Sequence, residues 1–123
     1  MLLQAEQVVK NFGGLTAVNH VDLEVDAGEI VGLIGPNGAG KTTILNCVAG
    51  TYKPTSGTVR FDGQDCTGAA AEVMCRRGLS RTFQIPRPFP KLTALENVMV
   101  GAIFGANHGS HIAAEKRAME ALE

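Results

Sequence analysis

The chain has 123 residues, of which 45% are hydrophobic, and its 11 Lys and Arg against 12 Asp and Glu leave a formal net charge of −1. This composition is that of one small globular domain, and it excludes a disordered chain and a global basic field for nucleic acid. The N-terminus has no basic start, and no apolar run approaches the roughly 20 residues of a membrane helix, so we expect neither a signal peptide nor a spanning segment. The three cysteines, which form no Cys-x-x-Cys pair, indicate reduced thiols.

The first third of the chain predicts three strands. Residues 2–12 include β-branched positions and stop at a Gly-Gly turn, while residues 16–26 alternate apolar and acidic side chains with a period of two. We expect these two strands to pair antiparallel. Residues 29–34 form a short apolar run, which is typical of a strand covered on both faces.

A Gly-rich loop and a helix come next. Residues 41–49 have a helix-compatible composition, with Ile44, Leu45 and Val48 expected on one side. Gly50 suits a C-terminal cap in the left-handed conformation. The order of strand, Gly-rich loop and helix is the one that phosphate-binding loops require.

The second half is predicted from turn and cap residues. A turn at 54–57, a strand at 58–61 and the Asp62-Gly63 pair indicate a hairpin, and a short helix is expected over 69–77, followed by an extended piece over 79–83.

Three prolines then exclude regular structure until Thr93, which forms a capping-box pattern with Glu96 and opens a helix. A last helix begins near His111 and shows no stop signal before Glu123, so we expect the chain to end inside a larger domain.

The loop Gly35-Pro36-Asn37-Gly38-Ala39-Gly40-Lys41-Thr42 has the pattern G-x-x-x-x-G-K-[ST]. Glycines allow backbone N–H groups to point at phosphate oxygens, and the helix dipole adds positive charge. Lys41 is predicted to meet the β- and γ-phosphates, Thr42 to bind Mg²⁺, and Thr43 to bond the α-phosphate. The alternative is a Gly-rich turn with a solvated lysine.

Four motifs then resemble one family. They are G-P-N-G-A-G-K-T-T at 35–43, G-x-x-x-P-x-x-G at 50–57, R-T-F-Q at 81–84 and L-T-x-x-E-N-V at 92–98. Together they are similar to ABC-type ATPases, and specifically to the ATP-binding subunits of branched-chain amino acid importers. The segment at 10–18 resembles the first strand of that family and its aromatic A-loop.

This resemblance implies roles for individual residues. Phe12 would stack on adenine, with a core residue at a strand end as the alternative, and Gln84 would be the Q-loop glutamine near Mg²⁺ and the attacking water, with an exposed loop residue as the alternative. The implied catalytic residues are Lys41 and Gln84, and the implied Mg²⁺ ligands are Thr42 and Gln84. The implied ATP-binding residues are Phe12, Gly35, Pro36, Asn37, Gly38, Ala39, Gly40, Lys41, Thr42 and Thr43.

The implied fold is an α/β P-loop NTPase of the ABC type, with a mixed sheet that begins with an antiparallel portion and is incomplete at the C-terminus. Residues 1–84 would be the β subdomain and P-loop core, and residues 85–123 the Q-loop and the start of the helical subdomain. The implied function is Mg-ATP binding in an importer for branched-chain or related amino acids. The alternatives are an ABC ATPase for another solute and a nucleotide-binding fragment without catalysis.

The same resemblance implies a second ATPase subunit, identical or not, together with membrane permease subunits, an external binding protein reached indirectly, and no nucleic acid. The location would be cytoplasmic, peripheral on the inner face of the membrane. The sequence contains neither L-S-G-G-Q nor an apolar run followed by Asp-Glu, and none of its histidines fits a switch position. We therefore expect the chain alone not to turn over ATP.

Overall fold

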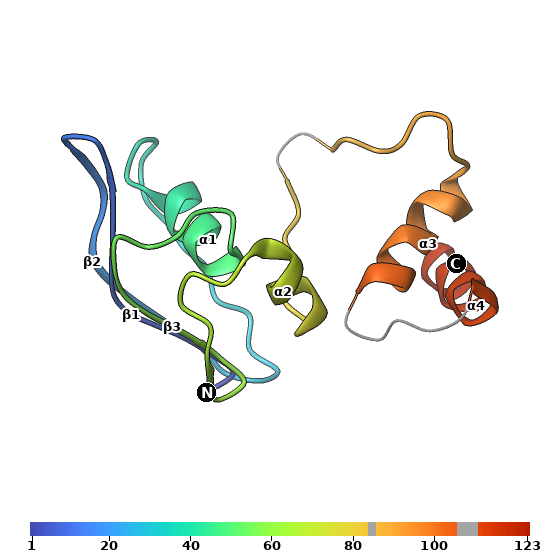
Figure 1. Cartoon of the computed structure of the whole chain (residues 1–123), viewed down its shortest axis with the longest axis horizontal. Helices are drawn as coiled ribbons and strands as arrows, with labels where there is room; N and C mark the ends of the chain where they lie inside the picture. The colour runs from blue at the N-terminus through green and yellow to red at the C-terminus, as the bar shows by residue number, and fades with distance from the viewer. Residues whose placement is uncertain (84–85, 106–110) are drawn as a thin grey trace. The chain divides into compact units, whose positions relative to one another are not determined.

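The computed structural model describes residues 1–83, 86–105 and 111–123, which form two compact units, Met1–Ala71 and Glu72–Glu123. The first unit is a four-stranded sheet in the order β2-β1-β3-β4, with one helix against it (Figure 1). Its elements are β1 (Leu3–Phe12), β2 (Leu15–Val25), α1 (Lys41–Ala49), β3 (Ser56–Phe61) and β4 (Gln64–Asp65). The second unit contains α2 (Ala71–Arg76), α3 (Ala94–Phe104) and α4 (His111–Leu122).

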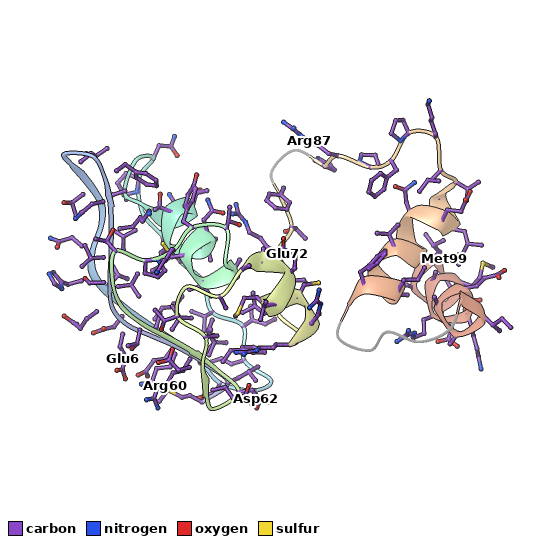
Figure 2. All side chains as sticks on the ribbon, in the orientation of Figure 1. Glu6, Arg60, Asp62, Glu72, Arg87 and Met99 are labelled. Atoms are coloured by element: carbon purple, nitrogen blue, oxygen red, sulfur yellow. The ribbon has the colours of Figure 1, made fainter. Side chains whose placement is uncertain are left out.

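The two long strands pair antiparallel, as the sequence predicts, with Leu3 opposite Val25 and Phe12 opposite Leu15. The core of the unit lies where α1 contacts β1 and β2. It is formed by small and β-branched side chains of the sheet and by the inner side of the helix. Glu6 and Arg60 are exposed and point away from α1 (Figure 2), so one face of the sheet is apolar and the other is polar. The buried residues between α1 and the sheet include Ala5, Val8, Val9, Val18, Val59, Ile44, Cys47 and Val48.

A β-bulge at Gln7 interrupts the regular pairing of β1 with both of its neighbours. The Gln7 backbone has a positive φ of 49°, and its N–H donates to Asp22 Oδ1 at 2.7 Å instead of to a strand carbonyl. The Gln7 side chain also donates to the Asp22 carboxylate. The backbone N–H and then the side chain of Gln7 lower the pKa of Asp22, because both bonds favour the ionised carboxylate.

The prediction of a strand over residues 29–34 is wrong. These residues form no strand in this structure, and Ile30 and Ile34 are 99% and 95% exposed. An apolar run becomes a buried strand only when neighbouring strands pair with it and layers cover it, and none of the described strands does so. Every described strand pair is antiparallel, which confirms the antiparallel portion of the expected sheet.

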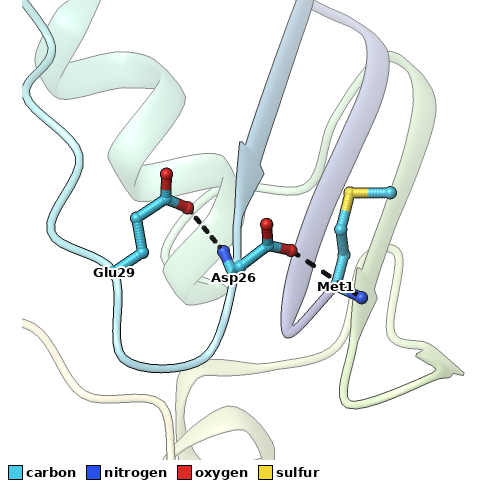
Figure 3. A network of polar contacts seen from close by, with 3 residues as sticks. All are labelled: Met1, Asp26 and Glu29. Carbon is cyan, nitrogen blue, oxygen red and sulfur yellow. Dashed lines mark hydrogen bonds and ion pairs between the residues drawn. The ribbon is translucent and has the colours of Figure 1, made fainter.

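The turn that precedes this segment is held by local polar contacts. The Asp26 N–H donates to Glu29 Oε2 at 2.8 Å, and the Asp26 carboxylate lies 3.9 Å from the terminal amine of Met1 (Figure 3). The Glu29 N–H donates back to the Asp26 carbonyl at 3.2 Å. The direction in which the chain leaves β2 is therefore set by the Asp26-to-Glu29 turn.

Helix α1 has the predicted bounds and ends at Gly50, whose φ of 89° is left-handed. Ile44 and Val48 are buried as expected, but Leu45 is 44% exposed. The expected inner position of Leu45 is wrong because the inner side of α1 is completed by Cys47 instead. Burial raises the pKa of the Cys47 thiol, and the nearby Lys10 charge opposes this only in part.

The hairpin from β3 to β4 turns at Asp62 and Gly63, whose φ values of 52° and 77° are both positive. Two consecutive positive φ angles are the mark of a tight primed turn, so the predicted turn is confirmed. Strand β4 has only two residues and was not predicted, since so short a strand leaves no periodic pattern.

In the second unit, the predicted capping box is present. The Glu96 N–H donates to Thr93 Oγ1, and the Thr93 N–H donates to the Glu96 carboxylate, both at 3.1 Å. The Asn97 amide also binds the preceding loop, because it accepts from the Phe89 N–H at 2.8 Å and donates to the Phe89, Leu92 and Thr93 carbonyls. Glu96 and Asn97 thus fix where α3 begins.

Helix α2 is two residues shorter at its start than predicted, and it ends before Gly78, whose φ is 102°. Helix α4 packs on α3 through the buried Ala114 and Ala118, and the Arg117 guanidinium donates to the Ala102 carbonyl at 3.1 Å. None of the helices among the described residues is long and apolar enough to cross a membrane.

Candidate nucleotide-binding site

The Gly-rich loop enters α1 through two glycines in left-handed conformations, Gly38 with φ 84° and Gly40 with φ 92°. The Ala39 N–H donates to the Pro36 carbonyl at 3.2 Å and closes the turn. The two glycines differ in their surroundings. A Cβ at Gly38 would meet no atom within 4 Å, whereas a Cβ at Gly40 would overlap the carbonyl oxygen of Ala17 in β2. Gly40 therefore permits a close approach of α1 to the sheet.

The first turn of α1 is open toward the loop. Gly40 is the N-cap residue and contributes no side-chain cap, and the first intrahelical bond runs from the Ile44 N–H to the Gly40 carbonyl at 2.9 Å. Helix geometry leaves the N–H groups of Lys41, Thr42 and Thr43 without acceptors inside the helix. Those N–H groups and the positive end of the helix dipole together make this helix end a candidate anion-binding site.

The Lys41 ammonium lies on the loop itself. It donates to the Gly35 carbonyl and, at 3.2 Å, to the Pro36 carbonyl. These bonds hold the charge beside the open N–H groups of α1, where neutral carbonyls are its acceptors. A phosphate group would be a stronger acceptor for this ammonium, because hydrogen bonds between ionised partners are roughly twice as strong as neutral ones.

A pocket of about 290 Å³ adjoins the loop and the start of α1. Thr42 and Thr43 line it from α1, and the first residues of β2 line it from the sheet. The pocket is lined by Leu15, Thr16, Ala17, Asn37, Gly38, Gly40, Lys41, Thr42 and Thr43. A volume near 300 Å³ is at the lower end of small-molecule sites. The structure thus brings together most of the predicted loop residues around one concave surface.

Phe12 is at the end of β1, opposite Leu15, which lines this pocket. Phe12 is 42% exposed, so it is not a core residue in this structure. The Tyr52 ring lies edge-on to it, with centroids 5.3 Å apart and planes 79° apart, and the Lys10 ammonium is 5.1 Å from its centroid. An exposed aromatic face at this point is what base stacking requires.

Gln84, the remaining predicted site residue, lies outside the described residues. Sequence reasoning also missed four contributors to the site. Three of them are Ala17, whose carbonyl restricts Gly40, and Leu15 and Thr16, which line the pocket; all three stand in the segment similar to the family's first strand. Tyr52 occupies an unspecified position of the G-x-x-x-P-x-x-G motif, so the motif gives no signal for it.

The different surroundings of Gly38 and Gly40 predict different losses of stability when each is replaced by alanine. Gly38→Ala should cost about 1 kcal/mol of unfolding free energy, because a left-handed φ strains an L residue. Gly40→Ala should cost about 1–3 kcal/mol more, since β2 or α1 must also shift away from the new methyl group. Urea denaturation of the 123-residue chain measures both losses. Equal losses for the two variants would contradict the close approach of Gly40 to Ala17.

Comparison with known proteins identifies the family of this chain. Residues 18–123 match the model of the ABC transporter family. The high-affinity branched-chain amino acid transport ATP-binding proteins LivG of Escherichia coli K12 and BraF of Pseudomonas aeruginosa are 50% and 46% identical over 99 residues. Each alignment covers 80% of this chain and 39% of the relative. The chain therefore spans about two fifths of the length of these relatives.

Solved structures agree with this match. A nucleotide-free ATP-binding cassette from an ABC transporter has a TM-score of 0.75 at 34% identity, covering 94% of this chain and 45% of its own. The dimeric post-hydrolysis structure of the cassette MJ0796, bound to ADP and Pi, has a TM-score of 0.81 at 32% identity, covering 98% and 55%. These cassettes confirm the predicted P-loop α/β fold class. The chain belongs to the ABC transporter family, as part of its ATP-binding cassette.

Proposed function

We propose that the chain is the Mg-ATP-binding part of an ATPase subunit that energises import of branched-chain or related amino acids. The observation that carries the proposal is the open first turn of α1, with the Lys41 ammonium held beside it by the Gly35 and Pro36 carbonyls. The names of the similar proteins LivG and BraF support the solute class.

Each residue of the site has a role in this proposal. The N–H groups of the loop and of α1 hold the phosphates, and Lys41 exchanges the two loop carbonyls for oxygens of the β- and γ-phosphates. Thr43 bonds the α-phosphate, and Phe12 stacks on the base. Thr42 lines the pocket, and its hydroxyl, with Gln84, would hold Mg²⁺, which when bound neutralises charge on the phosphate oxygens.

The proposal extends to assembly. A second ATPase subunit is expected as partner, which is supported by the dimeric form of the cassette MJ0796. Membrane permease subunits would hold the pair at the cytoplasmic face, and an external binding protein would deliver the solute. In this arrangement residues 1–84 form the β subdomain and P-loop core, and residues 85–123 form the Q-loop and the start of the helical subdomain.

Nucleotide affinity tests the site. Lys41→Ala should weaken binding of Mg-ATP by about 10- to 100-fold, because a hydrogen bond to a charged group contributes about 1.5–3 kcal/mol. Isothermal titration calorimetry of the 123-residue chain measures the affinity. Lys116→Ala, which removes an exposed lysine of α4, is the matched control and should leave the affinity unchanged. Equal affinities for wild type and Lys41→Ala would contradict the proposal.

The rate of ATP hydrolysis tests whether the chain alone binds ATP without hydrolysing it. The sequence does not hold L-S-G-G-Q, which in this family binds the γ-phosphate of the ATP on the opposite subunit. It also has no apolar run followed by Asp-Glu, which would supply the Walker B aspartate and the catalytic glutamate. We expect phosphate release from Mg-ATP by the 123-residue chain to stay near background. Robust release that disappears in Lys41→Ala would show that this expectation is wrong.

A further inference from the structure

The Tyr52 ring is the feature of the site that the proposed function leaves unused. It lies edge-on to Phe12, with the ring planes 79° apart and the centroids 5.3 Å apart. This is the arrangement that the ring quadrupoles favour. Tyr52 and Phe12 are 37% and 42% exposed, so neither is held by deep burial in the core. The contact between the two rings is therefore a specific restraint on how the Phe12 ring is turned.

Lys10 joins the same cluster. Its ammonium is 5.1 Å from the Phe12 centroid and 5.8 Å from the Tyr52 centroid, both within cation–π range. It also donates to the Lys53 carbonyl at 3.0 Å. Lys10 is two residues before Phe12, and Lys53 directly follows Tyr52. The Lys10 ammonium therefore links the two backbone segments that carry the rings, through its hydrogen bond to the Lys53 carbonyl.

Tyr52 is in turn fixed to the end of α1. The Asn46 carbonyl accepts from the N–H groups of three successive residues, Gly50, Thr51 and Tyr52. The start of the same nine-residue helix carries Lys41 and Thr42, which border the phosphate pocket. A helix of this length is rigid and about 13 Å long. The ring that touches Phe12 is thereby held at a constant distance from the predicted phosphate site.

We propose that Tyr52, together with Lys10, is a positioning residue that holds the Phe12 ring in the orientation in which it stacks on the base of the nucleotide. Tyr52 acts through Phe12 and does not itself contact the ligand. The inference rests on the proposed function, since it needs a nucleotide whose phosphates lie on the loop at the start of α1.

The test distinguishes the contribution of the base to binding from that of the phosphates. Calorimetry on the 123-residue chain compares the affinity for Mg-ATP with the affinity for inorganic tripolyphosphate in the presence of Mg²⁺. Tyr52→Leu keeps the apolar bulk of the side chain but removes the ring. It should lower the affinity for Mg-ATP about three- to tenfold and change the affinity for tripolyphosphate less than about twofold. Tyr52→Phe keeps the ring and should bind ATP like wild type. In a Phe12→Leu background, Tyr52→Leu should cause no further loss.

The other outcomes overturn the proposal in distinguishable ways. An equal loss for both ligands would make Tyr52 a support of the fold alone. Unchanged ATP affinity in Tyr52→Leu, or a loss that adds fully to that of Phe12→Leu, would show that Tyr52 does not act through Phe12. If the wild-type protein binds tripolyphosphate as tightly as ATP, the proposed phosphate site stands, but the proposed stacking of Phe12 on the base is ruled out. Wild-type protein that binds neither ligand would overturn the proposed function as well.

Discussion

The close approach of Gly40 to the Ala17 carbonyl is the constraint on which the site depends. It seats the start of α1 directly against β2, so that the open N–H groups of the helix face the pocket lined by the first residues of that strand. A side chain at this position would separate the helix from the sheet. The left-handed φ of 92° at Gly40 is the second requirement, and glycine meets both.

Local signals in the sequence predicted the elements that are fixed by local bonds. The end of α1 follows from its cap at Gly50, the start of α3 follows from the Thr93–Glu96 capping box, and the β3–β4 turn follows from Asp62-Gly63. The strand over residues 29–34 failed because its formation needs pairing with other strands, which a local apolar run cannot supply. The expectation that Leu45 shares one side of the helix with Ile44 and Val48 was wrong for a related reason, since contact with the sheet determines which side of a helix packs.

The site shows the same division between local and long-range information. The loop pattern indicated Lys41 and Thr42 because their chemistry depends on positions adjacent in sequence. Ala17 and Tyr52 became visible only in three dimensions, as each acts on a residue far along the chain: Ala17 on Gly40, and Tyr52 on Phe12. Helix α1 connects these contacts, because its first residue lines the candidate nucleotide pocket and the Asn46 carbonyl near its end accepts from the Tyr52 N–H.

The central claim is that the loop at 35–40 and the first turn of α1 bind the phosphates through backbone N–H groups. Hydrogen–deuterium exchange of the 123-residue chain with and without Mg-ATP measures those groups directly. The account predicts slower exchange in peptides that cover residues 37–43, with exchange in α4 unchanged. Bound ATP that leaves the exchange of residues 37–43 unaltered would contradict it.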